Sequence, residues 1–459
     1  MTAARMQPVV SPDLPAPWTT PQILRASLAA VFVSCLLVML AALWGARSHR
    51  QAIRTVGREA APAIIAAQHI EAALADMDAN AADEMLQPGG ATQLDKRREE
   101  AADAIIGAAG NPVFGDAERK AVRTLAAGVS VYSAEVQEAR DLRTVSGKRA
   151  LDAYRRAMEY MDSTLLPAAA QLDRAGREAI DRAYGARKGA SARALFLLIA
   201  SGLMLGFALF ALQVFLARRM RRILNPLIAL ATLTGFIFVS YAARSFVNAG
   251  HDLSVAKEDA FESMRAFWLT RSVASAAESD ESRYLLDPEH SGADERAFTG
   301  KTDRIARLPE TAPRAEILRD LSEGPNSAKR VNGFTGYLAD ELANVSFAGE
   351  REAAVDALAS YLDYLDTDKR IRKLEQSGQH QAAVALYAGT AQGQSRWAFN
   401  RFDAALGRGI EIDRRAFDQA VEDGFRDVSG FEITAPLAAA AIAGLTALGL
   451  RQRLREYSL

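Results

Sequence analysis

The sequence predicts an all-α protein in which four transmembrane helices carry two tandem extracytoplasmic antiparallel four-helix bundles. Four apolar stretches punctuate the 459 residues, and long polar segments separate the first stretch from the second and the third from the fourth. These polar segments are rich in Ala, Glu, Arg, Leu and Gln and have few β-branched runs, a composition that favours helices. Turn sequences divide the first polar segment into four pieces, which predicts four helices.

The apolar stretches cover residues 23–46, 194–217, 226–246 and 433–450. A helix needs about 20 apolar residues to cross a hydrocarbon layer of about 30 Å, so we expect each stretch to span a membrane. The fourth stretch is the weakest because its alanine run contributes little transfer free energy. It nevertheless contains no charged residue, and arginines follow it closely.

Positive charge near the helix ends predicts the orientation of the chain. Arginines dominate residues 218–222 and recur after the fourth stretch, and positive residues in short loops mark the cytoplasmic side. We therefore expect residues 1–22, 218–225 and 451–459 in the cytosol, with both large domains on the outer side of the cytoplasmic (inner) membrane. The basic link either only sets this topology or also binds anionic headgroups of membrane lipid.

Residues 47–193 form the first predicted outer domain. Apolar side chains recur at spacings of three and four along its last helix, from Leu151 onward, as in a helical bundle. Turn sequences at residues 87–90, 110–112 and 145–147 separate four helices. We expect an antiparallel bundle whose first and last helices continue into membrane spans.

Residues 247–432 form the second predicted outer domain, which repeats the opening of the first. Residues 86–88 (Leu-Gln-Pro) match residues 286–288 (Leu-Asp-Pro) at an offset of 200 residues. This match predicts an internal repeat produced by duplication. The second copy is longer, with extra loop-like material around residues 309–325 and 377–395, and it is richer in aromatic side chains.

No catalytic constellation is recognisable in the chain. The five histidines are scattered without metal-ligand spacing, and no phosphate-binding glycine loop or nucleophile elbow is present. Carboxylates are abundant, but on helical bundles they usually form a solvated face. The single cysteine, Cys35, lies in the first span, and the net charge of −1 provides no field that attracts nucleic acid. We expect no enzyme, no cofactor, no metal site and no nucleic-acid partner.

A binding site is a better expectation than an active site. The densest candidate is the stretch 396–403, where arginines stand beside aromatic residues. A guanidinium group pairs bidentately with a carboxylate, and aromatic rings supply an apolar floor. The alternative is that the aromatic side chains form the bundle core and the arginines extend out of it. The predicted ligand-binding residues are Trp268, Arg271, Arg283, Arg396, Trp397, Asn400 and Arg401.

Residues 278–289 (Glu-Ser-Asp-Glu-Ser-Arg-Tyr-Leu-Leu-Asp-Pro-Glu) resemble the end of the first helix in four-helix-bundle sensor domains. Such domains belong to methyl-accepting chemotaxis proteins and related receptors. Residues 78–89 carry a fainter version of the same pattern. Unlike chemoreceptors, the chain has no methylation helix and no adaptor-binding hairpin.

The whole chain also resembles a narrower family through residues 221–226, 396–403 and 449–457. That family comprises four-span bacterial membrane proteins found with a periplasmic amino-acid-binding lipoprotein and a cytosolic Ser/Thr kinase. The resemblance implies a relay in which the binding protein docks outside and the kinase is informed inside.

These observations predict a non-enzymatic transmembrane signal transducer. It would sense an extracytoplasmic small molecule or a liganded binding protein and relay that event to a cytosolic partner. Two alternatives stay open: a membrane scaffold or assembly protein, and an accessory subunit of a transporter. Self-association into a homodimer is also left open.

Overall fold

The computed structural model describes residues 19–87, 91–109, 116–220, 225–309, 313–323 and 331–455. In these ranges the chain is almost entirely helical and contains no β-strand. The one isolated β-bridge there joins Arg307 to Thr335. The expectation of an all-α protein is confirmed.

The chain divides into two compact units. The apolar unit consists of the described residues up to His49, of Gly189–Val247 and of the described residues from Val428 onward. The bundle unit consists of the described residues in Arg50–Lys188 and Asn248–Asp427. Both polar segments of the sequence therefore belong to one unit.

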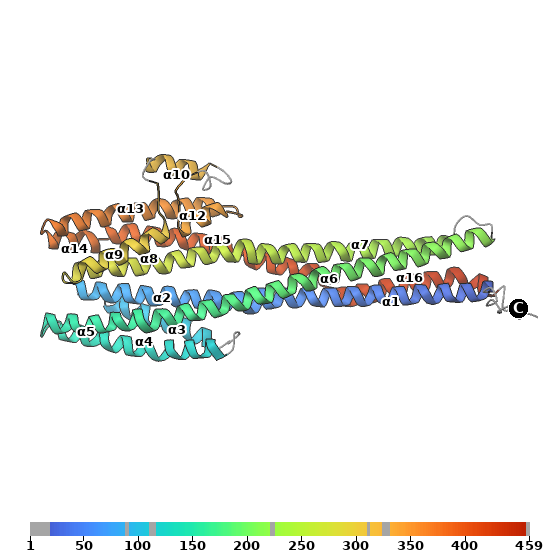
Figure 1. Cartoon of the computed structure of the whole chain (residues 1–459), viewed down its shortest axis with the longest axis horizontal. Coiled ribbons are helices and arrows are strands. Elements are labelled where there is room, and N and C mark those ends of the chain that lie inside the picture. The colour runs from blue at the N-terminus through green and yellow to red at the C-terminus, as the bar shows by residue number, and fades with distance from the viewer. Residues whose placement is uncertain are drawn as a thin grey trace, which may run out of the picture. The chain divides into compact units, whose positions relative to one another are not determined.

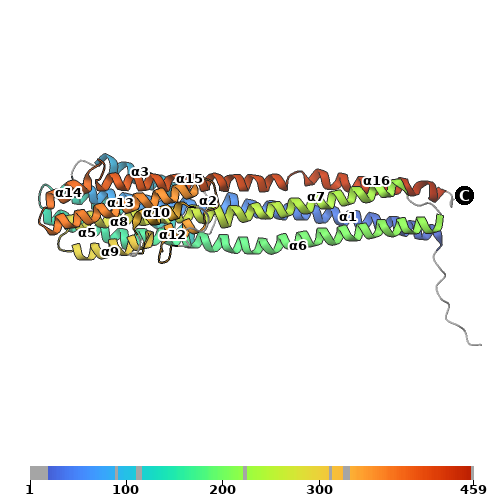
Figure 2. The ribbon, with the colours of Figure 1, turned by 90° about the horizontal axis from the view of Figure 1, so that it is seen from above.

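Four helices contribute the apolar unit and run alongside one another (Figure 1, Figure 2). Each contains one of the predicted apolar stretches and is long and apolar enough to cross a membrane. The prediction of four spans is confirmed, and the chain is a multi-pass membrane protein. The helices are α1 (Thr20–Ile53), α6 (Leu166–Met220), α7 (Pro226–Ser254) and α16 (Phe431–Arg455).

Local chemistry explains where α7 begins. Pro226 occupies its first position, where the missing N–H leaves no hydrogen bond unmade. The Asn225 side chain accepts a hydrogen bond from the Leu227 N–H at 3.1 Å, which caps the helix. The same side chain donates to the Gly449 carbonyl at 2.9 Å. Asn225 therefore ties the start of α7 to α16.

The first helix group of the bundle unit comes from the segment predicted as the first outer domain. Its apolar core is built from α2, α3, α4, α5 and the beginning of α6, with Leu74, Tyr132 and Tyr154 fully buried. Two of the predicted turns, at residues 87–90 and 110–112, lie mostly outside the described residues. The third is present, because Ser146 caps α5. The elements are η1 (Arg54–Ala60), α2 (Ala61–Leu86), α3 (Ala91–Ala109), α4 (Asp116–Leu142), α5 (Gly147–Tyr160) and η2 (Met161–Leu165), where η denotes a π-helix.

The second helix group contains additional short helices. The material expected to be loop-like includes α10 and α14, and α14 lies against the ends of α13 and α15 (Figure 1, Figure 2). The apolar pattern of the sequence did not predict α10 or α14, because a helix of nine residues is too short to show a helical periodicity. The elements are η3 (Val255–Phe261), α8 (Glu262–Leu286), α9 (Ser291–Ile305), α10 (Arg314–Ser322), α12 (Tyr337–Ala343), α13 (Glu350–Gln376), α14 (His380–Ala388) and α15 (Ser395–Asp427).

Candidate functional site: a buried polar seam between α2 and α8

The first helices of the two groups, α2 and α8, lie side by side and form the most extensive contact of the bundle unit (Figure 1). We call this contact the seam. Four serines of α8 donate hydrogen bonds to four carboxylates of α2. The pairs are Ser272–Glu71 (3.3 Å), Ser275–Asp76 (3.3 Å), Ser279–Asp78 (2.6 Å) and Ser282–Asp83 (3.1 Å). Small serine side chains allow the two helices to approach, and their hydroxyls satisfy acceptors that are partly or, at Asp78, almost fully removed from water.

The separation between partners in these four pairs is 199 or 201 residues. This is the offset at which the opening of the second domain repeats that of the first. The two helices therefore run parallel, with corresponding positions opposite one another.

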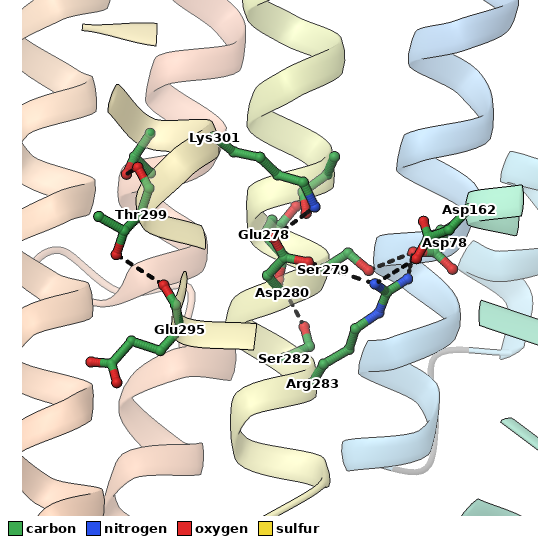
Figure 3. A network of polar contacts seen from close by, with 12 residues as sticks. Asp78, Asp162, Glu278, Ser279, Asp280, Ser282, Arg283, Glu295, Thr299 and Lys301 are labelled. Atoms are coloured by element: carbon green, nitrogen blue, oxygen red, sulfur yellow. Dashed lines mark hydrogen bonds and ion pairs between the residues drawn. The ribbon is translucent and has the colours of Figure 1, made fainter. Parts of the chain in front are cut away.

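Arg283 and Asp78 form the centre of the seam (Figure 3). Arg283 extends from α8 and pairs with Asp78 of α2, although its side chain is only 5% exposed. Asp78 also accepts a hydrogen bond from the Tyr132 hydroxyl at 2.9 Å. The Arg283 guanidinium lies 3.6 Å from the carboxylates of both Asp162 and Asp280. The buried Nε of Arg283 has no hydrogen-bond partner in the described structure, so the desolvation of the guanidinium is offset mainly by the three carboxylates around it.

A second contact, partly buried, joins α15 to α2. Arg396, the first arginine of the predicted ligand-binding stretch, pairs with Asp83 of α2. The Tyr387 hydroxyl of α14 also donates to Asp83, and it contacts the Ser282 hydroxyl. One carboxylate of the first group therefore holds three elements of the second.

The acidic run at the end of α8 is buried rather than solvated. Burial and then the charge of Asp83 raise the pKa of Glu278 well above its usual range. Burial and then the charge of Asp368 raise the pKa of Glu281 in the same direction. The Tyr364 hydroxyl donates to Glu281 at 2.8 Å. Asp280 is compensated differently, because Lys301 donates to it at 2.7 Å (Figure 3).

The structure places the predicted ligand-binding residues in three surroundings. Arg283 and Arg396 lie at the seam, paired with Asp78 and Asp83. Arg271 pairs bidentately with Asp403 at 2.5 and 2.6 Å.

The Arg271 guanidinium also lies 5.5 Å from the centre of the Trp268 ring, and that ring lies 5.4 Å from the ring of His69. Trp268 and Arg271 therefore share one neighbourhood close to α2.

The other three predicted residues, on α15, lie away from the seam. The Arg401 guanidinium covers the Trp397 ring at 5.0 Å and lies 3.5 Å from Asp363 of α13. Asn400 is exposed. The intervening Phe399 and Phe402 are buried in the core of the second group. The structure thus joins Trp268 with Arg271 but does not gather all seven residues around one point.

The carboxylates of α2 were not among the ligand-binding residues predicted from the sequence. Glu71, Asp76, Asp78 and Asp83 supply the acceptor side of the seam. The available signal was the similarity of residues 78–89 to residues 278–289. If the two copies pack with corresponding helices together, the acids of one copy meet the serines of the other.

A cleft of about 660 Å³ opens beside the seam, between α2, α6, α8, α9 and α12. Charged groups of both signs line it, and a buried N–H of Arg265 has no hydrogen-bond partner there. None of the seven predicted residues is among its lining residues. The charged side chains include Arg174, Arg265, Arg304, Glu71, Glu262 and Glu341.

Comparison with known families finds a similarity in the first helix group. Residues 52–185 match the family model of the actinobacterial sensor domain. This part of the chain is therefore similar to a bacterial sensor domain. The matched residues begin in α1, include all of α2, α3, α4 and α5, and end within α6. Comparison with curated proteins and with solved structures gives no significant match. The family description suggests sensing or signalling rather than catalysis.

Proposed function

We propose that this protein is a non-enzymatic transmembrane signal transducer that senses an extracytoplasmic stimulus through the bundle unit. The observation that carries the proposal is the buried seam, together with the sensor domain that supplies one of its sides. Buried ion pairs depend steeply on geometry because their desolvation is offset only by well-placed partners. A small displacement of α2 against α8 therefore changes several interactions at once, as a two-state device requires.

Helix continuity gives this displacement a route to the membrane. The helical backbone is continuous from Thr20 to Leu86 and from Pro226 to Leu286, so each helix of the seam belongs to a helix with a membrane span. A stimulus that favours one arrangement of the seam shifts the population of both states. The transmitted signal is then a movement of the spans.

The cleft beside the seam indicates the chemical class of a direct ligand. Its arginines suit a carboxylate and its acidic side chains suit an ammonium group, so a small zwitterion such as an amino acid matches both. A periplasmic amino-acid-binding lipoprotein and a cytosolic Ser/Thr kinase are the proposed partners, on the basis of the resemblance of the chain to the four-span family.

A crosslinking experiment tests the coupling without knowledge of the ligand. A Cβ atom built on Gly202 lies 3.5 Å from the Val239 Cβ, within the range that a disulfide requires. Gly202→Cys and Val239→Cys are introduced together into full-length protein carrying Cys35→Ser. We expect Asp83→Asn, which weakens the pair with Arg396, to change the rate of copper-catalysed disulfide formation in native membranes.

The control is Asp363→Asn, which removes the partner of Arg401 away from the seam. It should leave the crosslinking rate unchanged. The same cysteine pair is then used with L-glutamine, L-glutamate and L-aspartate as candidate stimuli. Equal rates for the Asp83→Asn protein and its parent, with no response to any of the three amino acids, would contradict signal transmission and favour a scaffold.

A further inference from the structure

Three carboxylates meet inside the second helix group, where α12, the start of α13 and α15 come together. They belong to Glu341, Glu350 and Asp413, whose exposed fractions are 1%, 0% and 0%. One oxygen from each lies within 4.8 Å of the others. Three acidic side chains are thus enclosed in a space that one ion can occupy.

These carboxylates lack the compensation found at the seam. Both oxygens of Glu341, both of Asp413 and Oε1 of Glu350 are buried without a hydrogen-bond partner in the described structure. No lysine or arginine of the described chain forms an ion pair with any of the three. Asp280 and Asp78, by contrast, pair with Lys301 and Arg283.

Backbone donors satisfy one oxygen of Glu350. Its Oε2 accepts hydrogen bonds from the N–H groups of Ser346 (2.7 Å) and Phe347 (2.8 Å), just before α13. The remaining oxygens of the cluster have no such donors in the described structure. A bound cation would supply the contacts that they lack.

We propose that Glu341, Glu350 and Asp413 bind a Ca²⁺ ion. Calcium takes six to eight oxygen ligands at 2.3–2.6 Å, so one ion reaches oxygens separated by up to about 4.8 Å. Carboxylate oxygens are the ligands that this hard cation prefers. Glu341 also lines the cleft beside the seam, which provides a path for the ion and for the waters that complete its coordination.

The ion would join three elements that lie far apart in the sequence. It would fix the short helix α12 and the start of α13 to α15, which itself packs along η3. This role is structural and independent of the proposed sensing function, because none of the three ligands belongs to the seam.

Calcium binding is tested on full-length protein in detergent after treatment with EDTA. Titration with CaCl₂ by calorimetry should show saturable binding. The thermal midpoint should rise by roughly 3–8 °C at about 100 times the dissociation constant. Asp413→Asn and Glu341→Gln keep the shape of the side chain but remove a ligand charge. Each should weaken binding by about 100-fold or more.

The matched control is Glu352→Gln, which removes an exposed carboxylate two residues from Glu350 on α13. It should bind calcium as the parent does. Without calcium, Asp413→Asn should melt no lower than the parent because it relieves repulsion, so its loss of binding is not a loss of folding. If calorimetry shows no binding by the parent, the proposal is overturned. Bound protons, and not a cation, would then neutralise the three carboxyl groups. Unchanged binding by both amide variants would place the ion elsewhere.

Discussion

At the scale of single residues, Arg283 has the largest predicted effect on stability. Its side chain is almost fully buried and faces Asp78, Asp162 and Asp280. Removing one partner of a buried ion pair leaves an uncompensated charge, which costs about 3–5 kcal/mol. Arg283→Met should lower the free energy of unfolding by that amount, measured by urea denaturation of the purified protein with tryptophan fluorescence.

A second substitution separates loss of charge pairing from loss of packing. Asp78→Asn combined with Arg283→Met removes both charges, and the single amide oxygen can still accept from either Tyr132 or Ser279, which donate to different oxygens of Asp78. The double variant should therefore be more stable than Arg283→Met alone. Arg401→Ala, which removes an exposed ion pair, should cost less than about 1 kcal/mol. An equal cost for the buried and the exposed arginine would contradict the importance of the seam.

Asp294 of α9 predicts a pH dependence of stability. Burial raises its pKa to about 6, the charge of Arg283 lowers it, and Asp280, Asp287 and His290 also act on it. Since the pKa is raised on folding, the folded state binds the proton more tightly. The stabilising contribution of this group is complete below the unfolded pKa of 3.8 and is lost as the pH rises through about 6.

Asp294→Asn keeps the shape of the side chain and removes this titration. The variant should match the parent near pH 4 and exceed its free energy of unfolding by about 1–3 kcal/mol at pH 7.5. Urea denaturation at the two pH values measures the difference. The control is Asp303→Asn, an exposed position on the same helix, which should follow the parent. A constant difference at both pH values would refute the raised pKa.

At the scale of elements, the two π-helices η1 and η3 occupy corresponding places. Each has seven residues, and each directly precedes the seam helix of its group. A short π-helical segment inserts one extra residue into an α-helix. Such segments are frequent at functional sites. η1 begins at residue 54 and η3 at residue 255, a separation close to that between the partners of the seam pairs.

Deleting one residue distinguishes the π-segments from the helices around them. Removal of Thr55 from η1 should convert its extra residue into regular α-helix and keep the register of α2, so the thermal midpoint should change little. Removal of Ala72 from α2 turns the rest of that helix by about 100°. It should displace Asp76, Asp78 and Asp83 from the seam and strongly lower the midpoint. Equal losses from both deletions would contradict this assignment of η1.

At the scale of the whole molecule, one chain supplies both sides of the seam. Corresponding helices of the two groups face each other, an arrangement that two copies of a shorter chain would otherwise have to provide. The offsets of 199 and 201 residues in the seam lie close to the repeat of 200 and agree with the proposed duplication. Self-association of the chain is thus not needed to form the seam.

The proposed relay predicts partners on both sides of the membrane. Gentle affinity purification of the tagged full-length protein from its own membranes, followed by mass spectrometry, should recover a solute-binding lipoprotein and a Ser/Thr kinase. The untagged strain supplies the background. Recovery of the protein alone would count against the relay and favour direct sensing in the cleft.

The site could be predicted only in part. Arg283 and Arg396 were singled out as arginines near aromatic residues, and both occupy the seam, yet their carboxylate partners come from α2, about 200 and 300 residues away. The cluster of Glu341, Glu350 and Asp413 has no local spacing typical of metal ligands. Acidic residues on helices were expected to face solvent, because composition does not reveal which face of a helix is covered by another helix.

The all-α class and the four apolar helices that can span a membrane follow from the sequence alone. Both depend on local properties, namely helix propensity and the length of apolar runs. Only the tertiary structure decided that the two helix groups share one buried seam and that three distant carboxylates meet. Those features depend on which helix faces pack together, and the packing decides whether a charged side chain is solvated, paired with an arginine or left to bind a cation.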